Sequence, residues 1–265
     1  MNLDALREAM EAEAEIALAA NDAAGWVIGA INPCELAYFA AVCRVSGVRR
    51  IVESGRQDGY STRILGRLAE RTGITVVSID MEIDQARADA CRARLAGLPL
   101  ELLKADAYRA VGEEIAKSAQ PTALLIDGPK GFPALALLLA ASRFEHVRVL
   151  ALHNLSAGRP WLPFFRTLGA TARMYEDVSG WNSLPAWNKL RAAEYEKFDQ
   201  LLGRDAVPSV SSLGVLSLPA ERPLPAFAQP FNCHQPAVLA ALWRLGAHAV
   251  ARRLFVASFH VFGNK

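Results

Sequence analysis

The sequence predicts an α/β protein built on a doubly wound, mainly parallel sheet of seven strands. From residue 49 onward, short β-branched or apolar runs alternate with amphipathic helical patterns. We expect strands at 49–53, 74–79, 99–103, 121–126 and 147–152, and helices at 59–70, 83–96, 109–118 and 132–142. The fourth and fifth strands are mostly apolar, which is typical of strands that helices cover on both faces. This alternation indicates strand–helix–strand units with parallel strands.

Further elements flank the alternating part. Two helices are expected before it, at 3–20 and 33–45, the second with Pro33 in its first turn. After it we expect a helix near 160–168, strands near 170–175 and 211–218, a charged helix at 188–202, and one long helix over 235–262. The chain therefore divides into N-terminal helices (1–48), a central sheet domain (49–219), and a Pro-rich connector with the C-terminal helix (220–265).

Composition excludes several classes of protein. The 265 residues suffice for one α/β domain with additions. Nucleic-acid binding is disfavoured, because the 29 basic residues are nearly balanced by 27 acidic ones and form no basic block. The sequence contains no run of about 20 apolar residues, so no membrane span is predicted. The acidic N-terminus is unlike a targeting segment. Four scattered cysteines fit reduced thiols in a cytoplasmic protein.

The stretch after the first strand has the pattern of a loop that binds a nucleoside cofactor. Gly55 and Gly59 let the backbone turn sharply and approach a ligand closely. The next strand ends at Asp80, where a nucleoside-binding unit places its ribose contact. A dinucleotide loop requires glycine at the position of Gln57, so NAD is disfavoured, and the Gly-Lys-Ser/Thr of a P-loop is absent from the sequence.

Polar side chains follow the predicted strands at the edge where such sheets bind ligands. They are Glu53, Asp80, Asp106, Asp127, His153 and Asn154. Asp106 is equally suited to cap the helix that follows it. Asp127, His153 and Asn154 come together if the fourth and fifth strands are neighbours, and they form either a site for a divalent ion or a hydrogen-bonded turn without metal.

The loop resembles that of class I S-adenosylmethionine-dependent methyltransferases, within the group of catechol, caffeoyl-CoA and antibiotic-sugar O-methyltransferases. The run Glu53-Ser-Gly55-Arg-Gln-Asp-Gly59-Tyr60-Ser61 matches the Glu-x-Gly-x-x-x-Gly-Tyr-Ser loop of that group, and the resemblance covers roughly residues 33–175. It implies a Rossmann-like methyltransferase sheet with S-adenosylmethionine as cofactor. The cofactor-binding residues that it implies are Glu53, Gly55, Gly59, Tyr60 and Ser61, Asp80 at the ribose, Asp106 near the adenine, and Asp127.

A second part of the resemblance concerns metal and catalysis. In the metal-using members the fourth strand ends Ile-Asp-x-x-Lys, as Ile126 to Lys130 do here, and the fifth ends Asp-Asn. Here His153 stands in place of that carboxylate, before Asn154. Asp127, His153 and Asn154 are thus candidate metal ligands, while the imidazole equally fits a metal-free enzyme with His153 as base. Lys130 matches a position that approaches the acceptor hydroxyl.

The predicted activity is methyl transfer from S-adenosylmethionine to the oxygen of a small hydroxyl-bearing molecule, with Asp127, Lys130 and His153 as catalytic residues. Two alternatives stay open. A catalytically inert S-adenosylmethionine-binding module is favoured by the departure at His153, and an NAD(P)-dependent oxidoreductase is disfavoured by Gln57.

Two further features concern surfaces. The apolar stripe of the C-terminal helix predicts that it packs across the domain or against a second copy in a homodimer. Three tryptophans flank the expected mouth of the pocket and either pack on the acceptor or belong to the core. They are Trp161, Trp181 and Trp187.

Overall fold

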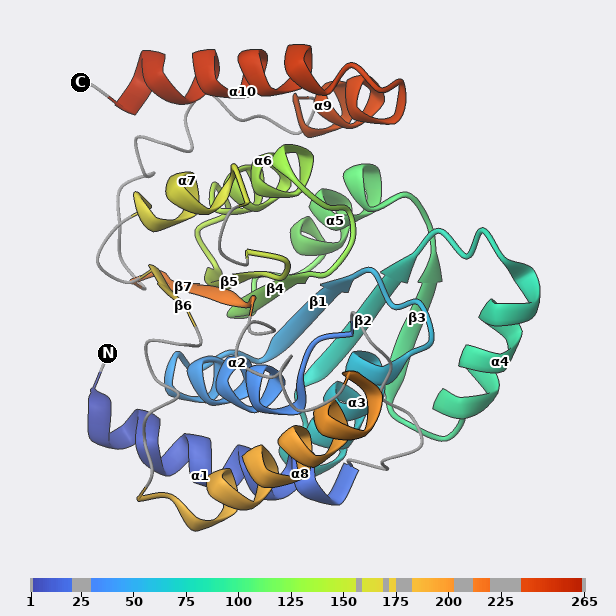
Figure 1. Cartoon of the computed structure of the whole chain (residues 1–265), viewed down its shortest axis with the longest axis vertical. Coiled ribbons are helices and arrows are strands. Elements are labelled where there is room, and N and C mark those ends of the chain that lie inside the picture. The colour runs from blue at the N-terminus through green and yellow to red at the C-terminus, as the bar shows by residue number, and fades with distance from the viewer. Residues whose placement is uncertain are drawn as a thin grey trace.

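The computed structural model describes residues 2–20, 30–155, 159–168, 172–174, 183–202, 212–219 and 235–263. Within these residues one sheet of seven strands has the order β3-β2-β1-β4-β5-β7-β6 (Figure 1). The strands are β1 (Arg50–Ser54), β2 (Thr75–Asp80), β3 (Leu100–Lys104), β4 (Thr122–Ile126), β5 (Val147–Leu152), β6 (Ala172–Met174) and β7 (Gly214–Ser217). β1 to β5 are parallel, and β7 runs antiparallel to both of its neighbours, β5 and β6. The predicted fold class is confirmed.

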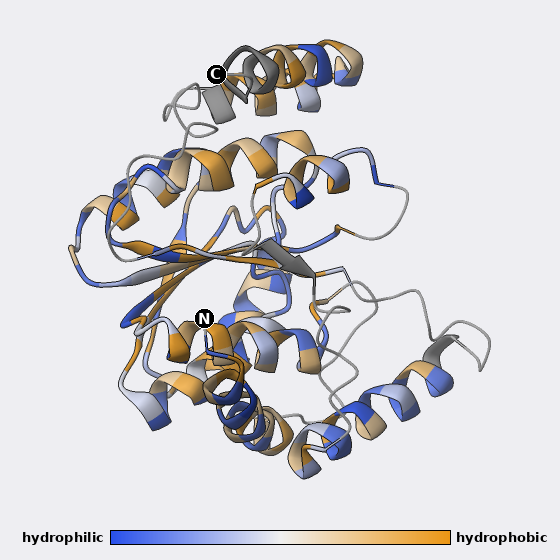
Figure 2. Cartoon of the chain, turned by 90° about the vertical axis from the view of Figure 1, so that its left-hand side faces the viewer, coloured by the Kyte–Doolittle hydropathy of each residue, from blue (hydrophilic) through white to orange (hydrophobic). Residues whose placement is uncertain are grey.

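Helices cover both faces of the sheet, which Figure 2 shows edge-on between two helical layers. The helices are α1 (Leu3–Ala20), α2 (Pro33–Val45), α3 (Tyr60–Thr72), α4 (Gln85–Leu95), α5 (Ala107–Ala116), α6 (Phe132–Ala141), α7 (Leu162–Arg166), α8 (Pro185–Leu202), α9 (Gln235–Arg244) and α10 (His248–Gly263). One hydrophobic core joins the sheet to α1, α2, α3 and α8. A second core joins the other face to α5, α6, α7, α9 and α10. Every strand and helix predicted between residues 49 and 152 is present, with ends displaced by at most two residues.

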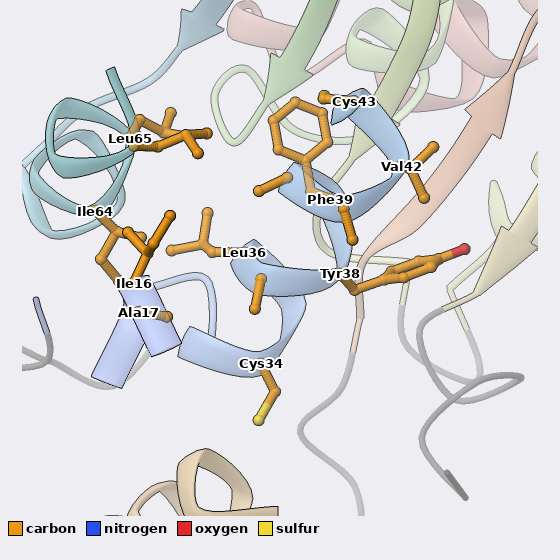
Figure 3. Packing of buried hydrophobic residues seen from close by; sticks show 14 of the residues in the cluster. Ile16, Ala17, Cys34, Leu36, Tyr38, Phe39, Val42, Cys43, Ile64 and Leu65 are labelled. Atoms are coloured by element: carbon orange, nitrogen blue, oxygen red, sulfur yellow. The ribbon is translucent and has the colours of Figure 1, made fainter. Parts of the chain in front are cut away.

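The N-terminal helices pack directly on the sheet. Asn32 and Glu35 form a capping box at the start of α2, where the Glu35 carboxylate accepts the Asn32 N–H at 3.0 Å. Figure 3 shows Leu36 of α2 beside Ile16 of α1 and Ile64 of α3. The region 1–48 therefore shares its core with the strands of the central domain.

The C-terminal part differs from the prediction of one long helix. The chain leaves α9 after Arg244 and begins α10 at His248, with Gly246 at φ 76° between them. A left-handed residue ends a helix because it turns the next carbonyl away from the helix axis. The predicted Pro-rich connector, 220–234, lies outside the described residues. Among the helices that are described, none is long and apolar enough to cross a membrane.

Candidate nucleoside-binding site

The turn after β1 touches the turn after β4 through their backbones. Gly55 has φ 89°, and a Cβ atom there would lie 2.4 Å from the backbone nitrogen of Gly128. The neighbouring Ser54 hydroxyl donates to the Gly128 carbonyl. Gly59 has φ 79°, and a Cβ there would lie 2.7 Å from Cys91 Sγ of α4. Only glycine fits these two positions, because each combines a left-handed backbone with close neighbours.

The buried Glu53, in β1, fixes this turn through hydrogen bonds of its side chain. Its carboxylate accepts the hydroxyls of Ser61, Thr62 and Ser78, each at 2.6 Å. Burial raises the pKa of Glu53, although the three hydroxyl hydrogen bonds oppose that rise. Since the side chain is fully buried and its polar contacts are used within the protein, Glu53 fixes the start of α3 against β1 and β2.

Asp80, at the end of β2, fixes the same turn through hydrogen bonds to its backbone. Its Oδ2 accepts the N–H groups of Arg56 at 2.8 Å and Gln57 at 3.1 Å, and its Oδ1 accepts the N–H of Glu82 at 2.8 Å. Burial alone would raise the pKa of Asp80, but these backbone hydrogen bonds and the charge of Arg56 hold it below its ordinary value. Asp80 is therefore a carboxylate at neutral pH.

A cavity of about 440 Å³ opens at the carboxyl ends of β1 to β4, a volume within the range of small-ligand sites. Met81 and Ile83 beside it are 43% and 86% exposed, although both are apolar. Gln57 and Glu82 have left-handed backbones, with φ 43° and 48°, a strain that gathers at ligand sites. The cavity is lined by Gly55, Arg56, Gln57, Ile79, Asp80, Met81, Glu82, Ile83, Asp84, Arg87, Ala88, Ala105, Asp106, Ala107, Tyr108, Asp127, Gly128, Pro129, Lys130 and Arg244.

Asp106 caps the helix that follows it and also lines the cavity, while its contact with a ligand stays a prediction. It caps α5, because its Oδ1 accepts the N–H of Tyr108 at 3.0 Å. Its Oδ2 lies 3.1 Å from Arg244 Nη2 and the residue lines the cavity. Arg244 belongs to α9, and the sequence carries no motif by which its place here could be predicted.

Asp127, at the end of β4, is the centre of a charged cluster. Its Oδ1 lies 2.5 Å from Lys130 Nζ, 2.6 Å from His153 Nδ1 and 3.5 Å from Asn154 Nδ2. Burial would raise the pKa of Asp127, but the contacts with His153 and Lys130 outweigh burial and hold it below its ordinary value. The four residues predicted to meet at adjacent strand ends do lie together.

The cluster does not fit the predicted divalent metal. The carboxylate oxygen of Asp127 already contacts a lysine ammonium, and Asn154 presents its amide nitrogen to His153 Nδ1 at 2.8 Å. A hard divalent cation requires oxygen ligands, and a nearby ammonium repels it. Within the described part of the chain, no group of three His, Cys, Asp or Glu residues could hold a metal. In this structure Asp127, His153 and Asn154 form the hydrogen-bonded arrangement that was the alternative to a metal site, and a metal at these residues stays a prediction.

His153 contacts Asp127 but is not among the residues that line the cavity. The residue is 5% exposed, and its Nε2 lies 3.8 Å from Glu35 Oε2. Glu35 also accepts the N–H groups of Ser212 at 2.6 Å and Leu213 at 2.8 Å. The imidazole is thus held between two carboxylates, from α2 and β4. Glu35 was not predicted as a site residue, because its place in the capping box of α2 already accounts for a glutamate there. Its contact with His153, which follows β5, leaves no signal in the sequence.

The predicted site residues fall into two groups. Gly55, Asp80, Asp106, Asp127 and Lys130 line the cavity. The other predicted residues are not among those that line it, and these are Glu53, Gly59, Tyr60, Ser61, His153 and Asn154.

The tryptophans that the structure describes belong to the core. Trp161 is 8% exposed and donates its Nε1–H to the Asn154 carbonyl at 2.9 Å. Trp187 is fully buried, and Trp181 lies outside the described residues. For Trp161 and Trp187, packing rather than contact with an acceptor accounts for the aromatic ring.

Comparisons with known proteins find similarity in structure only. No protein-family model and no curated protein matches the chain. Similar solved structures include a methyltransferase from Podospora anserina with SAH bound, with 14% identity, a TM-score of 0.42, and coverage of 80% of this chain and 88% of that one. An O-methyltransferase from Bacillus cereus in complex with SAH has 19% identity and a TM-score of 0.43, with 78% of this chain and 91% of that one covered. At this level of similarity the likeness assigns no activity.

Proposed function

We propose that this protein transfers a methyl group from S-adenosylmethionine to the hydroxyl oxygen of a small molecule. The proposal rests on one observation: the backbone N–H groups in the turn after β1 are already hydrogen-bonded within the protein. The N–H groups of Arg56 and Gln57 both donate to the Asp80 carboxylate. A turn that binds pyrophosphate keeps such donors for its ligand. Because these are occupied, the cavity suits a nucleoside cofactor without phosphate, which favours S-adenosylmethionine over NAD.

The surroundings of Asp80 suit a nucleoside. Asp80 Oδ2 already accepts two backbone N–H groups, but Oδ1 accepts only one, so Oδ1 keeps a lone pair that can accept a ribose hydroxyl. Met81 and Ile83 offer exposed apolar surface next to it, on which the face of a base can pack. Sugar and base can therefore be bound side by side along the end of β2.

The residues at the end of β4 suit the transfer of a methyl group from a sulfonium to an oxygen. The cofactor supplies a methyl group activated by a positively charged sulfonium. Asp127 stays ionised because its pKa is held low, and its charge favours a cation at that edge of the cavity. Lys130 lines the same edge with 44% of its side chain exposed, and its ammonium can stabilise the negative charge on an attacking oxygen. His153 acts through Asp127 as a positioning residue.

Calorimetry with SAH (S-adenosylhomocysteine) and with NAD tests the cofactor. We expect SAH to bind and NAD not to bind. Asp80→Ala should weaken SAH binding at least tenfold, since a hydrogen bond to a charged group contributes about 1.5–3 kcal/mol. Asp89→Ala, on the exposed side of α4, is the matched control and should leave affinity unchanged.

A second variant separates binding from chemistry. Lys130→Met should retain SAH affinity while SAH formation, measured with a panel of phenols, catechols and sugars, falls by about 10²–10³. Thermal melts of each variant establish that the fold persists. Wild-type protein that binds NAD but not SAH would contradict the proposal, as would unchanged SAH affinity in a folded Asp80→Ala variant.

A further inference from the structure

The paired helices α9 and α10 reach the cavity from the end of the chain. They pack on α6, and Figure 1 shows them as the outermost layer above it. The Trp243 ring lies against Gly131, where a Cβ atom would come within 2.9 Å of it, and its centroid is 6.3 Å from that of Phe132. Gly131 directly follows Lys130 of the cavity wall. The end of α9 is therefore fixed against the turn after β4.

The side chain of the next residue, Arg244, contacts cavity residues that follow β2 and β3. Its Nη2 lies 3.1 Å from Asp106 Oδ2 and 3.9 Å from Met81 Sδ. Its guanidinium lies over the Tyr108 ring, 5.6 Å from the centroid. These contacts join α9 to the residues that follow β2 and β3. Arg244 itself lines the cavity, with 53% of its side chain exposed.

We propose that Arg244 determines the recognition of the base in the nucleoside ligand, so that the C-terminal helices supply one wall of the site. This inference rests on the proposed function for the identity of the ligand. The guanidinium is planar and donates from its edge, and it packs on aromatic faces as it already packs on Tyr108. Placed between Met81 and Asp106, it covers the end of the cavity where a base next to Asp80 must lie. It also fixes the Asp106 carboxylate, whose remaining lone pairs can accept the exocyclic amine of adenine.

The Arg–carboxylate contact explains why arginine suits this position better than lysine. Arg244 makes its contacts with Asp106 and Tyr108 at the same time, through its edge and its face. A lysine ammonium is a point charge and cannot do both in this geometry. The conservative variant therefore distinguishes base recognition from simple charge.

The test measures calorimetric affinity of the full-length chain for SAH and for adenosine, which lacks the homocysteine part. Arg244→Ala should weaken both ligands by the same factor, roughly tenfold, because the lost contacts are all at the base. Arg244→Lys should restore only part of that loss. Arg253→Ala, an exposed arginine on α10, is the matched control and should change neither affinity.

The outcomes separate this inference from the proposed function. Wild-type protein that binds adenosine but not SAH would overturn the proposed function, and the adenosine affinity of Arg244→Ala would still test the base contact. Wild-type protein that binds SAH, with Arg244→Ala unchanged toward both ligands, would overturn the role of Arg244 alone. A loss for SAH without a loss for adenosine would also overturn it, because it would place the contact at the homocysteine part. Wild-type protein that binds neither ligand would overturn both proposals.

Discussion

At Gly55 the backbone of the β1 turn meets the backbone of the β4 turn. The Glu53-x-Gly55 spacing and the following Asp80 could be found in the sequence because the turn is local and has its own pattern. Glu35 and Arg244 could not be found in this way. Each reaches the site from a helix that is distant in sequence, and its position depends on how that helix packs on the sheet.

Gly55→Ala should strongly destabilise the protein, and Gly73→Ala is its matched control. Both glycines have left-handed backbones, with φ 89° and 70°, but a Cβ at Gly73 meets nothing within 4 Å. The control should therefore cost only the backbone penalty of about 1–2 kcal/mol. Gly55→Ala adds the clash with Gly128, for a total of about 3 kcal/mol or more. Equal urea midpoints for the two variants would mean that the turns do not touch.

Among the elements, α8 illustrates what periodicity predicts and what it omits. The charged helix at 188–202 was predicted and is present, beginning at Pro185. Its docking on α1 and α2 was not predicted, since a charged pattern does not specify a partner. Glu11 of α1 accepts the N–H groups of Ala186 at 2.6 Å and Trp187 at 3.3 Å. On the side of α2, the Glu194 carboxylate accepts the N–H of Cys34 in the first turn at 3.0 Å. Burial, together with the nearby Glu35, raises the pKa of Glu194 to about 7.

This carboxylate predicts a decrease in stability with rising pH. Because the folded-state pKa of Glu194 lies above its ordinary value, the folded protein retains a proton that the unfolded chain has released. The free energy of unfolding should therefore fall as pH rises from about 4.5 to beyond 7, by at most roughly 3 kcal/mol. Glu194→Gln mimics the protonated form and should remove the part of this decline that Glu194 contributes between pH 5 and 8.5. Glu196→Gln, exposed on the same helix, should keep it, and thermal melts that show the same pH dependence in all three proteins would refute the assignment.

At the scale of the whole molecule, one sheet separates two cores, and the cavity lies at the edge where four parallel strands end. The alternation of strands and helices predicted this arrangement, since parallel strands need helices on both faces. The place of the C-terminal helices could not be predicted. Their apolar stripe requires a covering surface, but it is equally compatible with α6 of the same chain and with a second copy.

A pair of neighbouring residues on α10 distinguishes these two forms of packing. Phe255 is fully buried, with its ring 5.0 Å from Phe132 of α6 and 5.5 Å from Phe164 of α7, whereas Leu254 is 46% exposed. If α10 is held by its own chain, Phe255→Ala should cost about 3–5 kcal/mol and Leu254→Ala at most about 0.5 kcal/mol. The melting temperature should then be independent of protein concentration. If a homodimer instead buries the outer face, Leu254→Ala should also destabilise and the melting temperature should rise with concentration, because association stabilises by mass action. Calorimetric melts of both variants at two concentrations, with light scattering on the same samples, decide between the two.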